Sequence, residues 1–391
     1  MVAHGGRVRF VFDPAFERYD FGPQHPLRPE RSRLVADLIE RLGWWRPGGP
    51  EHLEPLPADD DELHYVHTPR YVEVVRRLSA PHDSPDWFGY EHGFGVGDNP
   101  PFPGMHDATA LVAGGTLRAV RGILRGDFDH AFNPAGGLHH ALPEKASGFC
   151  IYDDPALACA AALREFDARV FYVDFDAHHG DGPQWIFYDE PRVFTLSFHE
   201  TGRFLFPGTG DVDELGRGRG QGYSANVPFQ PFTQDASWLD AVNAVLPELV
   251  ERFKPDLIVS VHGTDTHRWD PLTHMALSVN AMREQTRLTH ELAHAYCGGR
   301  WLALGAGGYD PYRVSSRAWS ALWAEMAGLP IPERLPASWL ERWQPRCNHP
   351  LPPTFADPDF EHPPMPRRAE IEAQNRSTVT RLRERLNHFH V

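Results

Sequence analysis

The stretch YVDFDAHHGDG, residues 172–182, places three aspartates and two histidines directly after an apolar run typical of a buried strand. Side chains along a strand alternate between its faces, so Asp174, Asp176 and His178 point the same way if the strand continues through them. A carboxylate and an imidazole from this row, joined by Asp265 from another strand end, would give a metal three protein ligands and leave one position open for water, as in catalytic zinc sites. The alternative is a buried hydrogen-bonded network or a set of helix caps, which five ionisable groups within eight residues disfavour.

A second histidine pair, His139 and His140, follows two glycines in the stretch GGLHHA. Alone, such a pair is more often structural or surface-exposed than catalytic. Asp174 and Asp181 remain as acids without a metal role, and a carboxylate behind each imidazole would fix its tautomer and raise its basicity. Two such His/Asp dyads beside a metal would serve as general acid and base.

Tyr309 comes at the end of a glycine-rich run in GAGGYD, residues 305–310. Glycines let the backbone approach a bound ligand closely, and a phenol placed there could donate a hydrogen bond to a developing oxyanion. The alternative is a tyrosine that caps the core and keeps its hydroxyl in water.

These polar clusters follow apolar, β-rich runs, and amphipathic helical segments lie between the runs. The alternation predicts an α/β fold, with a largely parallel central sheet and helices on both faces. Ligands bind beyond the carboxyl ends of the strands in such a sheet, so we expect the polar clusters to converge there. The expected strands span residues 7–12, 169–175, 192–198, 256–261 and 300–305. The expected helices span residues 31–43, 108–124, 240–253, 281–297 and 316–328.

Composition narrows the class of protein. A chain of 391 residues with 41% apolar residues can bury a sizeable core. The net charge of −15 argues against a nucleic-acid partner and favours, if anything, cationic partners. The four cysteines form no CxxC pair, which indicates neither a disulfide framework nor a thiolate zinc site. Because no apolar run is long enough to span a bilayer and the start does not resemble a signal peptide, we expect a cytoplasmic protein without a membrane partner.

Taken together, the motifs resemble the zinc-dependent histone deacetylase family, most closely its bacterial acetoin-utilisation (AcuC-like) branch. The match runs from HPLRPERSRLV, residues 25–35, to GAGGYDPYRVSSRAWSALWAEMAG, residues 305–328. Its order is specific: HHA, GFC, DxDxHHGDG, FPGTGDVDELG, GxD with DPL, and GGY. The resemblance implies the three-layer arginase/deacetylase fold, one Zn²⁺ per chain, and hydrolysis of an N-acetylated amine to acetate and the free amine.

The resemblance also implies roles for the metal cluster and the tyrosine. Asp176, His178 and Asp265 correspond to the zinc ligands. Tyr309 corresponds to the tyrosine that polarises the acetyl carbonyl and, with the metal, stabilises the tetrahedral oxyanion.

The histidine pair is implied to handle protons. His140, backed by Asp181, corresponds to the general base that takes a proton from the attacking water and then protonates the leaving amine. His139, backed by Asp174, corresponds to its electrostatic partner.

Further positions are implied to bind substrate and ions. Arg31 corresponds to an arginine that lines a channel behind the site. The implied substrate-binding residues of the acyl-lysine slot and its rim are Asp98, Gly148, Phe149, Phe206 and Leu272. A structural K⁺ or Na⁺ ion is implied at Asp174, Asp176, His178 and Ser197, and a second one at Phe187 and Tyr223.

Two departures from the family pattern concern the surroundings of the histidine pair. After GFCIY the chain has Asp153 and Asp154 where Asn-Asp is expected, which adds a carboxylate to the local hydrogen bonding. Asp154, which precedes Pro155, is expected to cap the following helix. NPAGGLHHA replaces a proline-rich run, and its Leu138 can alter the slot.

The first hypothesis for function is removal of acetyl groups from acetyl-lysine in proteins. An acetylpolyamine amidohydrolase would use the same catalytic residues, and the acidic net charge suits a cationic amine. A non-catalytic acyl-lysine binder is disfavoured because every matched catalytic position is intact. A two-manganese ureohydrolase of arginase type would need additional bridging carboxylates.

Two segments stand apart from the alternating pattern. Residues 80–105 are rich in proline, aspartate and glycine and are expected to form a long surface loop. We expect a deacetylase catalytic domain over residues 1–345. Residues 346–391 are expected to form a C-terminal arm with a helix that packs on the domain or on a partner subunit, which leaves a homo-oligomer open.

Overall fold

The structure is a computed structural model that describes residues 7–80, 87–95, 97–357 and 364–389. Its centre is an eight-stranded sheet in the order β2-β1-β3-β8-β7-β4-β5-β6, in which every neighbouring pair is parallel. The strands are β1 (Val8–Val11), β2 (His52–Leu53), β3 (His130–Asn133), β4 (Val170–Asp174), β5 (Val193–Glu200), β6 (Ser224–Phe229), β7 (Leu257–Val261) and β8 (Trp301–Leu304). The predicted parallel α/β sheet is confirmed.

The inner strands are short apolar runs because both faces of the sheet are covered. Every residue of β4, β7 and β8 is buried. The five predicted strands correspond to β1, β4, β5, β7 and β8, whereas β2, β3 and β6 were not predicted. β2 has only two residues, and β6 contains Pro228, which is tolerated because β6 is an edge strand.

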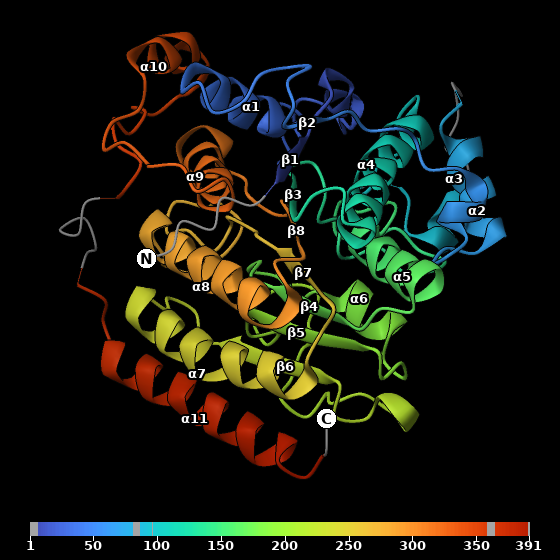
Figure 1. Ribbon diagram of the computed structural model, residues 1–391, viewed down its shortest axis with the longest axis vertical. Coiled ribbons are helices and arrows are strands. Elements are labelled where there is room, and N and C mark those ends of the chain that lie inside the picture. The colour runs from blue at the N-terminus through green and yellow to red at the C-terminus, as the bar shows by residue number, and fades with distance from the viewer. Residues whose placement is uncertain (1–6, 81–86, 96, 358–363, 390–391) are drawn as a thin grey trace.

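Helices form a layer on each side of the sheet (Figure 1). On one side α4 (Met105–Arg125) packs against α5 (Asp154–Phe166), and on the other α8 (Val279–Cys297) lies between α7 (Asp235–Phe253) and α9 (Ser316–Met326). The remaining α-helices are α1 (Arg31–Arg41), α2 (Asp60–Leu63), α3 (Pro69–Leu78), α6 (Asp181–Ile186), α10 (Ala337–Trp343) and α11 (Arg368–Leu386). Among the described residues, no helix is long and apolar enough to cross a membrane.

The expected arm, residues 346–391, is described except for residues 358–363 and 390–391. Its helix α11 packs against α7 and β6, and Figure 1 shows it alongside α7. The Asn375 amide donates to Thr233 and Ser237 at that contact. Before the gap, Asp357 is buried in an ion pair 2.8 Å from Arg317 of α9. The described part of the arm thus contacts α7, β6 and α9 of its own chain, while the division at residue 345 and any contact with a partner subunit stay predictions.

The expected loop over residues 80–105 is partly described, since residues 81–86 and 96 lie outside the described ranges. It contains a 3₁₀ helix, η2 (Trp87–His92), and leads into α4 at Met105.

Candidate metal-dependent active site

Four adjacent strands deliver the polar clusters to one edge of the sheet. β3, β8, β7 and β4 are neighbours in that order, and all run in the same direction. His139 and His140 follow β3, Asp176 and His178 follow β4, Asp265 follows β7, and Tyr309 follows β8. These residues therefore lie together at the carboxyl ends of the strands, where parallel sheets bind ligands.

Asp176, His178 and Asp265 point their ligand atoms at one another. His178 Nδ1 lies 3.0 Å from Asp176 Oδ1 and 3.0 Å from Asp265 Oδ2. All three side chains are buried, with their ligand atoms within 4.8 Å of one another. Two carboxylates buried this close together need positive charge between them. The donor set therefore fits Zn²⁺, with a position left open as in catalytic sites.

Backbone N–H groups hold the outer oxygens of these carboxylates. Gly307 N–H donates to Asp176 Oδ2 at 2.7 Å, and Ala177 N–H donates to Asp265 Oδ1 at 2.9 Å. A Cβ atom on Gly307 would lie 2.1 Å from Asp265 Oδ2 and 2.5 Å from Asp176 Oδ2. Any side chain there would displace both carboxylates, so the glycines of GAGGYD are required by close approach.

Each histidine of the pair has a carboxylate behind it. His139 Nδ1 lies 2.6 Å from Asp174 Oδ2, and His140 Nδ1 lies 2.6 Å from Asp181 Oδ1. The two imidazole centroids are 4.0 Å apart. His139 Nε2 is 3.9 Å from Asp176 Oδ1, which places the histidine pair directly beside the three candidate metal ligands. The His/Asp pairing matches the dyads that the sequence analysis expected.

The two imidazoles titrate in opposite directions. Burial opposes the charged form of His139, but Asp174 and Asp176 outweigh it and raise the pKa of His139 to about 10. Burial, followed by the charges of His139 and His178, lowers the pKa of His140 well below its ordinary value. Neighbouring groups whose pKa values are pushed apart can take different roles, and at His140 the neutral form is favoured.

Two adjacent aspartates support the loop that carries the histidine pair, and here the helix-cap prediction was wrong. Asp153, not Asp154, caps α5, since Asp153 Oδ1 accepts from Ala156 N–H at 2.7 Å. Asp154 is already helical, and its carboxylate accepts from the N–H groups of Gly137 and Leu138 at 2.8–3.1 Å. Burial raises the pKa of Asp153 well above its ordinary value. The neutral form of Asp153 is therefore favoured, and that form resembles the expected asparagine.

Tyr309 is positioned by an aspartate that the sequence analysis did not single out. Asp270 accepts from Tyr309 N–H at 2.9 Å and from Leu272 N–H at 2.9 Å, which ties the loop after β8 to the loop after β7. Burial, followed by the charges of Asp265 and Asp176, raises the pKa of Tyr309 well above its ordinary value. The phenol therefore stays protonated and able to donate. The DPL motif that contains Asp270 was the available signal.

Gly148 and Phe206 pack beside His140. A Cβ atom on Gly148 would lie 2.5 Å from His140 Cδ2 and 2.8 Å from Phe206 Cε1. The Phe206 ring centroid is 5.0 Å from that of His140, and the side chain is 42% exposed. Phe206 therefore spans from the histidine pair to the solvent.

Phe149 packs between Tyr309 and His25. Its ring centroid lies 5.7 Å from Tyr309 and 4.4 Å from His25. His25 Nε2 lies 3.2 Å from the Asp98 carbonyl oxygen, and the Asp98 side chain is exposed. Leu272 is 36% exposed. The structure thus places Asp98 and Leu272 at the surface and Phe149 beside the catalytic tyrosine candidate.

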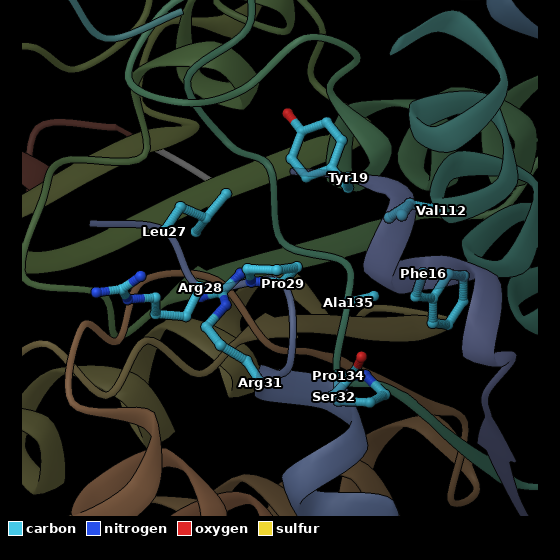
Figure 2. A pocket seen from close by; sticks show the side chains of 10 residues that line it. All are labelled: Phe16, Tyr19, Leu27, Arg28, Pro29, Arg31, Ser32, Val112, Pro134 and Ala135. Carbon is cyan, nitrogen blue, oxygen red and sulfur yellow. The ribbon is translucent and has the colours of Figure 1, made fainter. Parts of the chain in front are cut away.

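Arg31 lies in a small cavity at the start of α1, shown in Figure 2. Its Nη1 donates to the Ala306 carbonyl at 2.5 Å, next to the Gly307 N–H that holds Asp176. Tyr19, which also lines the cavity, donates to the Phe149 carbonyl at 2.6 Å. The cavity adjoins the active site, and its free volume of about 20 Å³ holds roughly one water.

The monovalent-ion positions form two groups. Asp174 and Ser197 are register partners on β4 and β5, and Asp176 and His178 follow Asp174 directly. The carbonyl groups of Phe187 and Tyr223 accept from the N–H groups of Glu190 and Thr195, respectively. Ion binding at either group stays a prediction.

The chain is similar to known proteins over most of its length. The sequence profile of the histone deacetylase domain matches residues 25–326. The acetoin utilization protein AcuC of Bacillus subtilis is 44% identical over 372 residues, which are 95% of each chain. The AcuC protein of Staphylococcus xylosus is 37% identical over 369 residues, 94% of each chain.

Two solved structures share the fold. The crystal structure of an HDAC homologue complexed with SAHA superposes with a TM-score of 0.84 at 29% identity, covering 94% of this chain and 99% of that one. The crystal structure of an HDAC homologue from Aquifex aeolicus gives a TM-score of 0.83 at 28% identity, with the same coverage.

Proposed function

Because this chain belongs to the histone deacetylase family and is a deacetylase, we propose that it removes acetyl groups from N-ε-acetyl-lysine in proteins. The observation that carries the proposal is the convergence of the Asp176, His178 and Asp265 ligand atoms beside two His/Asp dyads. An amide is a poor electrophile, so its hydrolysis requires several catalytic groups acting together.

Asp176, His178 and Asp265 are proposed to hold one Zn²⁺ ion, the metal on which the family depends. When bound, zinc supplies a Lewis acid that polarises the acetyl carbonyl and lowers the pKa of water. The backbone N–H groups of Ala177 and Gly307 fix the outer carboxylate oxygens and so set the direction of the ligand atoms.

His140 is proposed as the general base and, later, the general acid. Its Nδ1 faces Asp181, so the proton of the neutral ring lies on Nδ1 and Nε2 is free to take a proton from the attacking water. The same proton then passes from Nε2 to the leaving amine. Asp174 favours the charged form of His139, which would add positive potential beside the developing oxyanion.

Tyr309 is proposed to donate its phenolic hydrogen to the acetyl oxygen. Asp270 holds the Tyr309 backbone, and Phe149 packs across the ring at 82°. A donor fixed in advance stabilises an oxyanion without reorganisation at the moment of reaction. Phe149 and Phe206 would enclose the lysine methylenes and keep water from the amide.

The rim favours a peptide over a free amine. Phe206 and Leu272 are partly exposed and offer apolar contact to a polypeptide, and the exposed Asp98 carboxylate can accept from substrate N–H groups. The competing substrate is an acetylpolyamine, which the net charge of −15 would attract.

Parallel initial rates distinguish these substrates. Zinc-reconstituted protein is assayed on an acetyl-lysine peptide and on N-acetylputrescine, with Asp176→Ala as the control for contaminating activity. We expect faster turnover of the peptide. Faster turnover of N-acetylputrescine would make this a polyamine enzyme, and no turnover of either would indicate a binder or a longer acyl group.

A further inference from the structure

Three histidines meet at the amino end of the sheet, away from the active site. His130 is the first residue of β3, and His290 and His294 are one turn apart on α8. His290 Nε2 lies 3.2 Å from His130 Nε2 and 3.1 Å from His294 Nε2. One nitrogen of each ring lies within 4.8 Å of the other two. We call these three residues the imidazole cluster.

Hydrogen bonding among the rings does not account for this arrangement. His290 Nδ1 lies 3.0 Å from Glu325 Oε1, and a carboxylate only accepts, so Nδ1 of His290 carries the proton. In the neutral form of this ring Nε2 has a single lone pair, and two other Nε2 atoms lie within 3.2 Å of it. One lone pair in the ring plane cannot accept linear hydrogen bonds from both neighbours. A cation placed between the three nitrogens would satisfy all of them.

The geometry suits a tetrahedral metal. Zn–N bonds of about 2.0–2.1 Å at tetrahedral angles put ligand nitrogens roughly 3.3 Å apart. The His130 ring is close to perpendicular to the His290 and His294 rings, at 86° and 83°, so the rings are not stacked. The Glu325 contact is the carboxylate–histidine arrangement that orients metal-bound imidazoles.

Burial and access also suit a bound ion. His130 is fully buried and His290 is 7% exposed, whereas His294 is partly exposed and gives a path to solvent. Trp301, the first residue of β8, stacks on His290 at 5.4 Å and closes the apolar side. Burial and the two neighbouring imidazoles lower the pKa of His130 to about 3, so its ring is in the neutral form that ligates metals.

We propose that His130, His290 and His294 bind a second divalent transition-metal ion of the zinc class, with Glu325 positioning His290. Imidazole ligands select Zn²⁺, Co²⁺ or Ni²⁺ over Mg²⁺ and Ca²⁺. The ion would link α8 to β3 through His290 and His130, which are 160 positions apart in the sequence. It would lie at the opposite end of β3 from His139 and His140, so the site has a stabilising role and takes no part in deacetylation.

Zinc binding to the metal-free full-length protein tests the proposal. The Asp176→Ala/Asp265→Ala variant removes the catalytic ligands and is expected to retain one zinc per chain by calorimetric titration. Adding His294→Ala to this variant should abolish that binding, and adding His388→Ala, a change at an exposed histidine, should leave it unchanged. Co²⁺ in place of zinc should give the visible absorption of a tetrahedral site only when His294 is present.

A conservative variant distinguishes a specific loss of zinc binding from misfolding. Glu325→Gln keeps the size of the side chain and is expected to weaken zinc binding about 10- to 100-fold in the same background, with unchanged circular dichroism. Loss of all zinc binding from the Asp176→Ala/Asp265→Ala variant, with native circular dichroism, would overturn the proposal. Zinc binding that persists after His294→Ala would also overturn it, and the three rings would then be a packed histidine cluster without a metal.

Discussion

The two ends of β3 carry two differently built polar clusters. At the carboxyl end, the loops that follow the strands bring together carboxylates and imidazoles, and two buried carboxylates would balance the charge of a dication. At the amino end, three imidazoles face one another, and the Glu325 carboxylate lies behind the His290 ring. Loops at strand ends can direct side chains of several types toward a substrate. Histidines fixed by their spacing on a helix can bind a metal ion but leave no slot for a substrate. We therefore assign catalysis to the carboxyl end of β3 and a stabilising role to its amino end.

The largest expected effect is at the carboxyl end. Asp176→Ala removes a ligand and should lower turnover of an acetyl-lysine peptide by roughly 1,000-fold or more, because both the Lewis acid and the activated water depend on bound zinc. Metal analysis should show one zinc fewer per chain, with the imidazole cluster still loaded. Full turnover in this variant would break the assignment of chemistry to this end.

Tyr309→Phe separates metal binding from oxyanion stabilisation at the same end. The change removes a single donor, so kcat should fall about 100- to 1,000-fold while zinc content stays at the wild-type value. Stopped assays on the acetyl-lysine peptide, paired with metal analysis of the same samples, measure both. A variant that keeps wild-type kcat would exclude a role for the phenol.

The pH profile tests the His140 dyad. Burial raises the pKa of Asp181 to about 6, so the carboxylate is charged above that pH and protonated below it. Protonation removes the acceptor for His140 Nδ1–H, and kcat should therefore fall as pH decreases through about 6. Asp181→Asn should lower kcat roughly 10- to 100-fold and remove this acidic limb. An unchanged limb in the variant would assign it to another group.

The smallest expected effect on activity is at the amino end. His294→Ala should leave kcat and KM for the acetyl-lysine peptide unchanged. It should lower the melting temperature of the zinc-loaded protein by a few degrees, because it removes a ligand that stabilises only the folded state. Thermal unfolding with and without zinc measures this difference. A loss of deacetylation as large as that of Asp176→Ala would contradict the division between the two ends.

The distance in sequence between the residues of each cluster explains which of the two ends could be predicted. Asp174, Asp176, His178 and Asp181 lie within eight residues at the end of a predicted strand, so their periodicity and chemistry could be recognised together. In the imidazole cluster, His130 and His290 are 160 residues apart, and the sequence presents His290 and His294 only as one face of an amphipathic helix. Only the pairing of α8 with β3 brings them together.

Local interactions that depend on tertiary structure were also missed. Asp270 carries no signal beyond its place in a short motif, because its role comes from the Tyr309 backbone across two loops. Asp153 and Asp154 are both plausible helix caps, and the loop at Gly137 and Leu138 decides which one is used. β3 consists of HAFN, whose first and last residues are polar, so no apolar run identifies it in the sequence.

The most direct test of the deacetylase assignment is zinc-dependent release of acetate from an acetyl-lysine peptide. Protein stripped of metal with a chelator should be inactive, and activity should return with zinc in the wild type and in His294→Ala but not in Asp265→Ala. Activity that survives complete removal of metal, or that returns in Asp265→Ala, would contradict the assignment of catalysis to Asp176, His178 and Asp265.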